Sequence, residues 1–307
     1  MTFGCSLRVR GVAAAVRPRS AASHLRDRDV GDGARISPTA HYTGEVWVRS
    51  GLSHPALSTT RGALFHAALA PLNGIYGRLA GRSDLDAMLV ARHRAIDRLL
   101  EREIAAGRVG QVIEIAAGLS GRGYRFARRF PALHYVDTDL EGMAAHKRRA
   151  LGRAGLRRPN HEVRTLDVLA VDGPASLEAV AAAVPPSRGL AIVTEGLLSY
   201  LARDAVLDLW RRIAATLADF PHGSYFSDLH LGADVDGMWI PELFRMGLEL
   251  FARGAVRYHF ASVDETVAEL GAAGFRDAHL YRPTEVVPAG RPDREPDHLV
   301  RILAAAT

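Results

Sequence analysis

The chain has 307 residues, of which 48% are hydrophobic and 24% are charged, a composition typical of a soluble globular protein. Every apolar stretch is interrupted by Arg, Asp, Gly or Pro, so none reaches the roughly 20 residues that a membrane-spanning helix needs. The single cysteine, Cys5, excludes an internal disulfide and a thiolate metal cluster. We therefore expect a cytoplasmic protein without a membrane partner, and we find no His, Asp and Glu spacing typical of a metal site.

The net charge of +5 is concentrated at the N-terminus, because residues 1–26 contain five arginines and no acidic residue. The rest of the chain is neutral and lacks the basic stripe that binding to a phosphate backbone requires, so we expect no nucleic-acid partner. We interpret residues 1–30 as a basic leader, either a disordered tail or an over-long start, although Arg-rich and acid-poor composition is also typical of transit peptides.

A helical region is predicted between the leader and residue 108. Pro38, Pro55 and Pro71 divide residues 36–81 into short helical pieces, which we interpret as a helical cap. From residue 85 the apolar residues recur at helical spacing until Gly107, which predicts one long amphipathic helix.

From residue 109 the apolar period changes, and short β-rich runs alternate with helical stretches. This alternation predicts a doubly wound, mostly parallel α/β sheet over residues 109–283, with an insertion at about 232–260. The predicted strands are 111–117, 133–139, 161–169, 190–196 and 223–231, with a closing strand at 276–283. The predicted helices are 122–130, 141–155, 174–184, 203–220, 236–253 and 263–273, and residues 284–307 are assigned to a C-terminal tail.

Small residues follow the first predicted strand, in the order Glu114-Ile-Ala116-Ala-Gly118-Leu-Ser120-Gly121. Small side chains let a ligand approach the backbone, and open α/β sheets bind ligands at the carboxyl ends of their strands. The pattern fits a dinucleotide-binding fingerprint whose first glycine is replaced. It fits equally well a methyltransferase motif with two substitutions, so these residues leave both interpretations open.

Acidic residues end the next strands, where they are expected to meet at one edge of the sheet. Asp137 and Asp139 end the second strand, and Asp139 lies 21 positions after Gly118, a spacing typical of an acid that binds a ribose diol. Asp167 follows the third strand and Glu195 follows the fourth. The alternatives are that Asp139 only caps a helix and that Glu195 pairs with an arginine of the cap.

Taken together, these residues resemble the leucine carboxyl methyltransferase family, and more closely its bacterial branch that includes the carboxyl methyltransferase of tetracenomycin polyketide synthesis. The resemblance runs from about residue 37 to residue 282. It rests on Ala91-Arg92, Glu114 to Ser120, Asp137-Thr-Asp139 with Lys147, Asp167-Val168, and Glu195-Gly196 with Tyr200-Leu201. Two positions depart from the family pattern: Ala116 replaces a glycine, and Ser120 stands where an aspartate is usual.

The resemblance implies a class I Rossmann-like methyltransferase fold with S-adenosylmethionine as cofactor and S-adenosylhomocysteine as product. It implies that Arg92 holds the cofactor's carboxylate, that Asp139 holds the ribose, and that Glu195 lines the methyl-transfer site. The other implied cofactor-binding residues are Glu114, Ala116, Gly118, Asp137, Asp167 and Val168. His41 or Tyr42 is the nearest candidate for the family's N-terminal basic contact.

The expected reaction is methyl transfer to a small-molecule acceptor, most simply a carboxylate, which is already ionised and needs no general base. A phenol would benefit from a base, and His230 is the candidate, with Glu195 and Tyr200 as the other predicted catalytic residues. Arg49, Arg61 and Arg245 are candidates for binding an acidic acceptor. The alternatives are a hydroxyl O-methyltransferase of secondary metabolism, an NAD(P)-binding oxidoreductase, and a catalytically silent binding protein. The oligomeric state is not readable from the sequence.

Overall fold

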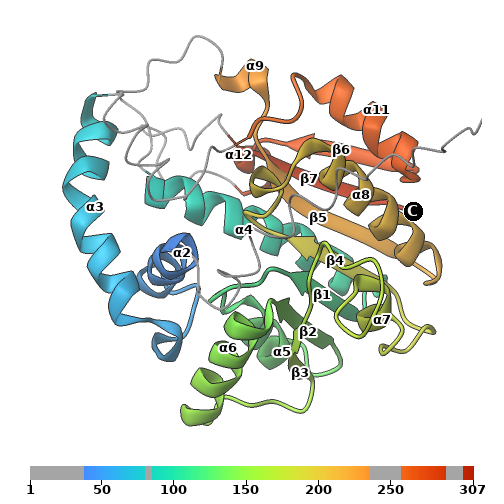
Figure 1. The fold of residues 1–307 in the computed structure, drawn as a ribbon, viewed down its shortest axis with the longest axis horizontal. Helices are drawn as coiled ribbons and strands as arrows, with labels where there is room; N and C mark the ends of the chain where they lie inside the picture. The colour runs from blue at the N-terminus through green and yellow to red at the C-terminus, as the bar shows by residue number, and fades with distance from the viewer. Residues whose placement is uncertain (1–37, 80–84, 236–256, 288–299) are drawn as a thin grey trace, which may run out of the picture. The chain divides into compact units, whose positions relative to one another are not determined.

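The computed structural model describes residues 38–79, 85–235, 257–287 and 300–307 (Figure 1). The predicted leader at 1–30 and the predicted helix at 236–253 lie outside these residues. The described residues form a seven-stranded sheet in the order β3-β2-β1-β4-β5-β7-β6. The strands are β1 (Gln111–Ile115), β2 (His134–Asp139), β3 (His161–Thr165), β4 (Leu190–Thr194), β5 (Gly223–Leu229), β6 (Asp277–Tyr281) and β7 (Arg301–Ala306).

The five strands β1 to β5 are parallel, which confirms the predicted doubly wound sheet. Strands β1 and β4 are buried along their whole length, as expected for parallel strands with helices on both faces. The chain runs outward from β1 to β3 and then returns to β4 beside β1. In sheets of this kind, ligands usually bind where the chain reverses in this way, which here is at the carboxyl ends of β1 and β4.

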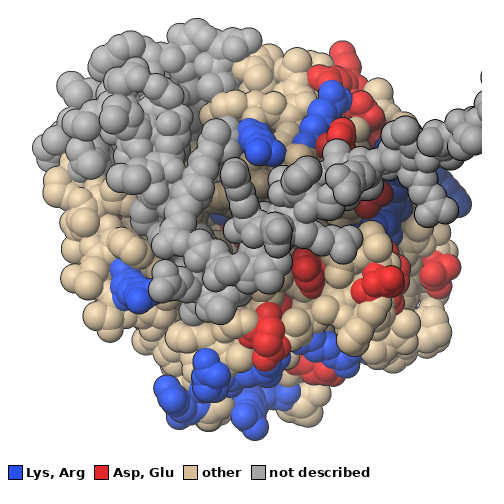
Figure 2. All heavy atoms as spheres, in the orientation of Figure 1, with Lys and Arg blue, Asp and Glu red and all other residues tan. Residues whose placement is uncertain are grey.

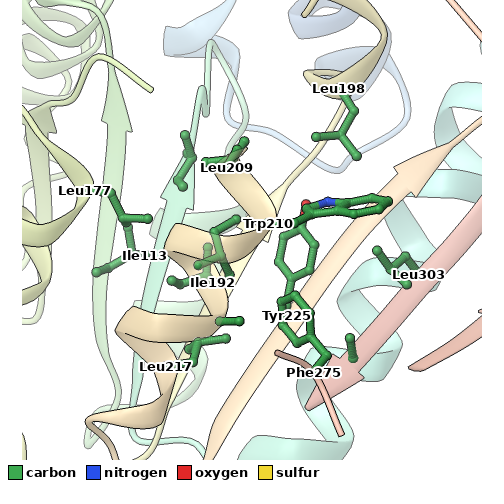
Figure 3. Packing of buried hydrophobic residues seen from close by; sticks show 14 of the residues in the cluster. Ile113, Leu177, Ile192, Leu198, Leu209, Trp210, Leu217, Tyr225, Phe275 and Leu303 are labelled. Atoms are coloured by element: carbon green, nitrogen blue, oxygen red, sulfur yellow. The ribbon is translucent and has the colours of Figure 1, made fainter. Parts of the chain in front are cut away.

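Apolar side chains join each face of the sheet to its helices. On one face, Trp210 of α8 (Arg203–Ala218) stacks on Phe260 with ring centroids 5.0 Å apart, and Tyr225 of β5 stacks on Phe275 at 5.7 Å (Figure 3). On the other face, Ile96 and Leu100 of α4 belong to the second core cluster. The other helices of the sheet domain are α4 (Leu85–Ala105), α5 (Arg122–Arg129), α6 (Glu141–Arg153), α7 (Leu177–Ala181), η2 (Leu198–Tyr200), α9 (Gly232–Val235), α11 (Val263–Ala273) and α12 (Pro283–Val286).

The predicted helical cap is present as α2 (Pro38–Arg49), η1 (Pro55–Leu57) and α3 (Thr60–Leu79). Pro38 and Pro55 begin helices as expected, but Pro71 lies inside α3 and does not divide it. A proline in a helix interior removes one backbone hydrogen bond and costs about 3 kcal/mol. Packing between α2 and α3 opposes this cost, with the Phe65 and Leu69 side chains against a cluster that contains Tyr42.

The sequence prediction assigns residues 284–307 to a C-terminal tail. This assignment is wrong for residues 301–306, which form β7 in the sheet. Strand β7 lies between β5 and β6 and is antiparallel to both. Its Ile302 and Leu303 side chains are fully buried, one on each face of the sheet. The three alanines that follow have low β propensity and no alternating pattern, so the sequence gives little sign of this central strand.

Basic side chains on the face shown in Figure 2 gather over α6, where Arg148, Arg149 and Arg153 are at least partly exposed and Lys147 is buried. Lys147 and Arg148 form ion pairs with Asp137 and Glu141. Burial and then the nearby Arg149 and Arg153 lower the pKa of His146.

Of the helices within the described ranges, none has both the length and the apolar character needed to cross a bilayer.

Candidate active site

The loop after β1 has the unusual backbone that the small residues predicted. Ala116 and Gly118 both adopt left-handed conformations, with φ of 54° and 48°. An L-residue such as Ala116 adopts this conformation at a cost of about 1 kcal/mol, which the surrounding structure must supply. Among the described residues, a Cβ added at Gly118 would meet only the Cβ of Ala40, 3.8 Å away, so these residues leave the backbone open to a close approach. Ser120, in place of the family's aspartate, accepts a hydrogen bond from the backbone N–H of Arg122 at 3.1 Å.

Asp139 lies at the carboxyl end of β2 and is joined directly to this loop. Its Oδ2 accepts the backbone N–H of Gly118 and its Oδ1 accepts that of Leu140, both at 2.8 Å. Burial raises the pKa of Asp139, although these two N–H groups and Lys147 oppose the rise. Each carboxylate oxygen keeps one further lone pair, so the side chain has the two acceptors that a vicinal diol needs.

The next predicted acid, Asp167, follows β3 at the same ends of the strands. It is half-buried, and its Oδ1 accepts the backbone N–H of Leu169 at 3.0 Å. The adjacent Val168 packs against the main core, and its carbonyl oxygen accepts a hydrogen bond from Arg212 at 2.9 Å. The backbone N–H of Leu166 donates to the Asp139 carbonyl at 2.9 Å, so the segment that carries Asp167 runs beside the end of β2.

Glu195, immediately after β4, is enclosed by three basic side chains. Its Oε1 accepts a hydrogen bond from Arg92 Nε at 3.0 Å, and its Oε2 accepts from His93 Nδ1 at 2.8 Å and from Arg122 Nη2 at 2.6 Å. Burial alone would raise the pKa of Glu195, but His93, Arg122 and Arg92 hold it well below its usual value. The carboxylate is therefore ionised and has little capacity to accept a proton.

Arg92 of α4 connects Glu195 to the end of β5. Its Nη1 donates to Asp228 Oδ2 at 3.0 Å, and Asp228 Oδ1 accepts the backbone N–H of Gly196 at 2.6 Å. A Cβ added at Gly196, whose φ is 66°, would lie 3.2 Å from Arg92 Nη2. This amino group therefore faces the Glu-Gly turn, and no acceptor for it lies among the described residues. Burial would lower the pKa of Arg92, but Asp228 and Glu195 raise it.

Arg122, at the first position of α5, is fully buried and holds three elements together. Its Nε donates to Asp97 of α4 at 2.6 Å, its Nη1 to Glu114 of β1 at 2.5 Å, and its Nη2 to Glu195. Despite burial, these carboxylates raise the pKa of Arg122 well above its usual value. The sequence interpretation missed Arg122, His93 and Asp97. The one signal was the i, i+4 spacing of His93 and Asp97 on the buried face of the predicted long helix.

Two predicted cofactor-binding acids do not reach the site. Glu114 is 1% exposed, and its oxygens accept from Arg122 and from the Tyr135 hydroxyl, the latter at 2.7 Å. Asp137 is fully buried and pairs with Lys147 and His161, both at 2.8 Å. Burial alone would raise the pKa of Asp137, but these two partners hold it at about 2. The partners of both acids lie inside the fold, so neither side chain is directed beyond the strand ends.

The remaining predicted catalytic residues lie near the strand ends. Tyr200, in η2, is 45% exposed. His230 directly follows β5, is half-buried, and meets the Tyr258 ring edge to face with centroids 6.1 Å apart. Both side chains therefore lie near the ends of β4 and β5, and neither is among the hydrogen-bond partners of Glu195.

The other candidates for anion binding differ in their surroundings. Arg49 pairs with Glu45 at 2.8 Å, Arg61 is exposed, and Arg245 lies outside the described residues. His41 Nδ1 lies 2.8 Å from the Thr59 hydroxyl, and burial, followed by Arg61 and His146, lowers its pKa. The Tyr42 hydroxyl donates to Asp86 at 2.5 Å.

Comparison with known proteins identifies the family. Residues 68–214 match the family model of leucine carboxyl methyltransferase. A protein of Mycolicibacterium paratuberculosis assigned as an S-adenosyl-L-methionine-dependent methyltransferase is 30% identical over 227 residues, which are 71% of this chain and 67% of that protein. The chain belongs to the S-adenosylmethionine-dependent methyltransferases, and residues 68–214 are similar to the leucine carboxyl methyltransferase family.

Other relatives agree with this membership. A protein of Mycolicibacterium smegmatis with the same assignment is 36% identical over 188 residues, 57% of each chain. The fold of this methyltransferase is similar to the crystal structure of a protein from Thermobifida fusca assigned as a methyltransferase, with a TM-score of 0.59, 16% identity, and coverage of 91% of this chain and 98% of that one. The predicted family and the class I methyltransferase fold are confirmed, and the oxidoreductase alternative is wrong.

Proposed function

We propose that this methyltransferase forms methyl esters, transferring the methyl group of S-adenosylmethionine to the carboxylate of a small molecule. The observation that carries the proposal is the state of Glu195. Its oxygens already accept three hydrogen bonds from Arg92, His93 and Arg122, and its pKa lies well below the usual value. A group held this firmly as an anion is a poor general base, and a carboxylate acceptor needs none.

The residues at the strand ends fit the cofactor. Asp139 has two free acceptor positions for a ribose diol, the Gly118 backbone is open, and Arg92 Nη2 is a donor suited to a carboxylate. Asp167 and Val168 stand beside Asp139, where an adenine would bind. Bound there, S-adenosylmethionine would supply a methyl group that already carries its leaving group, so the chain's own work is to orient the acceptor and exclude water.

Arg92 and Glu195 would interact with different parts of the bound cofactor. Arg92 is held by two carboxylates through Nε and Nη1, so Nη2 has a fixed direction and binding costs little side-chain entropy. Glu195 keeps negative charge next to the same turn, which favours a cationic sulfur nearby. Neither residue transfers a proton in this proposal.

A second candidate function is methylation of a phenol or another hydroxyl. The observation in its favour is the half-buried His230 ring against Tyr258 after β5, since an imidazole near the acceptor would take the hydroxyl proton. The two functions predict different pH profiles. A carboxylate acceptor gives a rate that is constant from about pH 6 to 8, whereas a base-assisted phenol gives a rate that rises through the pKa of the histidine.

The test uses the purified chain, S-adenosylmethionine with a deuterated methyl group, and a matched panel of aromatic acids and phenols on the same ring systems. Mass spectrometry locates the label, and mild base separates esters, which lose it, from ethers, which keep it. Base-labile label on the acids supports the proposal. Base-stable label on the phenols, abolished by His230→Ala, favours the second function. Cofactor binding without any transfer across the panel would point to a catalytically silent protein.

A further inference from the structure

Asp228, near the end of β5, joins two parts of the candidate site through a single carboxylate. Its Oδ2 accepts a hydrogen bond from Arg92 Nη1 at 3.0 Å, and its Oδ1 accepts the backbone N–H of Gly196 at 2.6 Å. The side chain is only 4% exposed. Asp228 takes no part in the proposed methyl transfer itself, so its contribution to the site lies in these two contacts.

The strand and the helix around Asp228 explain why it meets Arg92. Side chains alternate along a strand, so Asp228 points to the same face of the sheet as Phe226, which belongs to the second core cluster together with Ile96 of α4. Arg92 lies one helical turn before Ile96 and therefore on the same side of α4. Strands β4 and β5 pair in parallel up to the residue before Asp228, so Asp228 lies next to the turn that follows β4.

The two contacts of Asp228 fix the directions of two donors at once. The Arg92 guanidinium is planar, and its Nε and Nη1 are bound to Glu195 and Asp228, so the direction of its third nitrogen, Nη2, is determined. Gly196 has a left-handed φ of 66°, and its N–H is held by the same Asp228 carboxylate. A Cβ added at Gly196 would lie 3.2 Å from Arg92 Nη2, so the two groups are close neighbours. Asp228 therefore keeps Arg92 Nη2 at a fixed position relative to the turn.

We propose that Asp228 is a positioning residue that makes the site depend on the amino-acid part of the cofactor, an inference that rests on the cofactor placement in the proposed function. In that placement Arg92 Nη2 would donate to the cofactor's carboxylate, and the sulfur would lie at the Gly196 turn. Asp228 sets the distance between these two points without touching the cofactor. The site then discriminates between an adenosyl amino acid and a nucleoside that lacks the amino-acid chain.

The test compares two ligands that differ in the part that Arg92 would hold. S-adenosylhomocysteine carries the amino-acid carboxylate, and 5′-methylthioadenosine is a thioether of the same nucleoside without the amino-acid chain. Calorimetry gives the dissociation constant of each ligand, and the ratio of the two constants measures recognition of the amino-acid part. The measurement needs no acceptor, so its result does not depend on whether the acceptor is a carboxylate.

Asp228→Asn removes one of the two acceptors, because an amide has a single acceptor oxygen and cannot serve both Arg92 and the Gly196 N–H. We expect this variant to bind S-adenosylhomocysteine roughly tenfold more weakly, since the charge-assisted hydrogen bond from Arg92 loses its direction. Its affinity for 5′-methylthioadenosine should equal that of the wild type. Asp234→Asn is the matched control, because Asp234 also pairs with an arginine, Arg301, and is 12% exposed. The control should leave both affinities unchanged.

Equal weakening of both ligands in folded Asp228→Asn, or no change in either, overturns the inference. If that variant does not fold, Asp228→Glu decides, because it keeps both acceptor oxygens but moves them by one methylene group. Its affinity ratio should also fall, and a wild-type ratio would contradict the assignment of Asp228. Equal affinity of the wild type for the two ligands would likewise contradict it, since Arg92 would then not hold the amino-acid part. Failure of the wild type to bind either ligand or S-adenosylmethionine would instead refute the proposed function.

Discussion

Replacing Arg122 by lysine tests how strongly the three buried ion pairs of Arg122 stabilise the protein. Lysine keeps the positive charge, but its single ammonium group cannot reach Asp97, Glu114 and Glu195 in the directions that the planar guanidinium serves. Losing one or two charge-assisted hydrogen bonds of about 1.5 to 3 kcal/mol each lowers the free energy of unfolding by about 3 kcal/mol. Domains of this kind are stable by only about 5 to 15 kcal/mol, so the effect is large.

The assay for Arg122→Lys is urea unfolding followed by circular dichroism, with the affinity for S-adenosylmethionine measured in the same samples. Arg129→Lys is the matched control, since Arg129 lies on the same helix and pairs with Glu101 but is 63% exposed. The control should unfold at the wild-type urea concentration, because exposed ion pairs contribute little. Arg122→Lys should also bind the cofactor more weakly, since Glu195 loses a partner. Wild-type stability and affinity in Arg122→Lys would refute the reasoning.

Two further predictions concern the acids of β2. Asp139→Asn should weaken S-adenosylmethionine binding by roughly 1 to 3 kcal/mol, because the ribose hydroxyls lose a charged acceptor. Calorimetry measures the affinity, with the exposed Asp172→Asn as the control. Equal affinity in the two variants would show that Asp139 does not belong to the site. The pKa of Asp137 is held at about 2, below its unfolded value of about 4. The pairing of Asp137 with Lys147 and His161 therefore stabilises the fold above pH 4, and this stabilisation is lost as the pH falls toward 2. The urea midpoint should fall over that range in the wild type and less in Asp137→Asn, and parallel curves for the two proteins would contradict the assignment.

Local sequence patterns were sufficient to predict the sheet and the order of the residues at the carboxyl ends of its strands. Continuous apolar runs such as 190–194 identify buried parallel strands, and the residue after each run is placed at the carboxyl end by topology alone. For this reason Gly118, Asp139, Asp167 and Glu195 were predicted together without any knowledge of their contacts. Strand β7 was missed because its alanines carry no strand signal, and pairing with both β5 and β6 decides its structure.

The partners of buried charges were harder to predict, because they depend on which side chains meet in three dimensions. Glu114 and Asp137 sit in the same motifs as the candidate residues at the strand ends, yet one alternation along the strand points them between the sheet and its helices. Arg122 appeared only as the residue that follows the small-residue loop. Only the structure shows its role, because there the Arg122 guanidinium, at the start of α5, donates hydrogen bonds to Asp97 of α4 and to Glu195.

The most direct test of the account is a crystal structure of the chain with S-adenosylhomocysteine. We predict that both ribose hydroxyls donate to Asp139, that the amino-acid carboxylate accepts from Arg92 Nη2, and that the sulfur lies at the Gly196 turn beside Glu195. A nucleoside bound elsewhere, with Asp139 and Arg92 making only their present contacts, would contradict the proposed site.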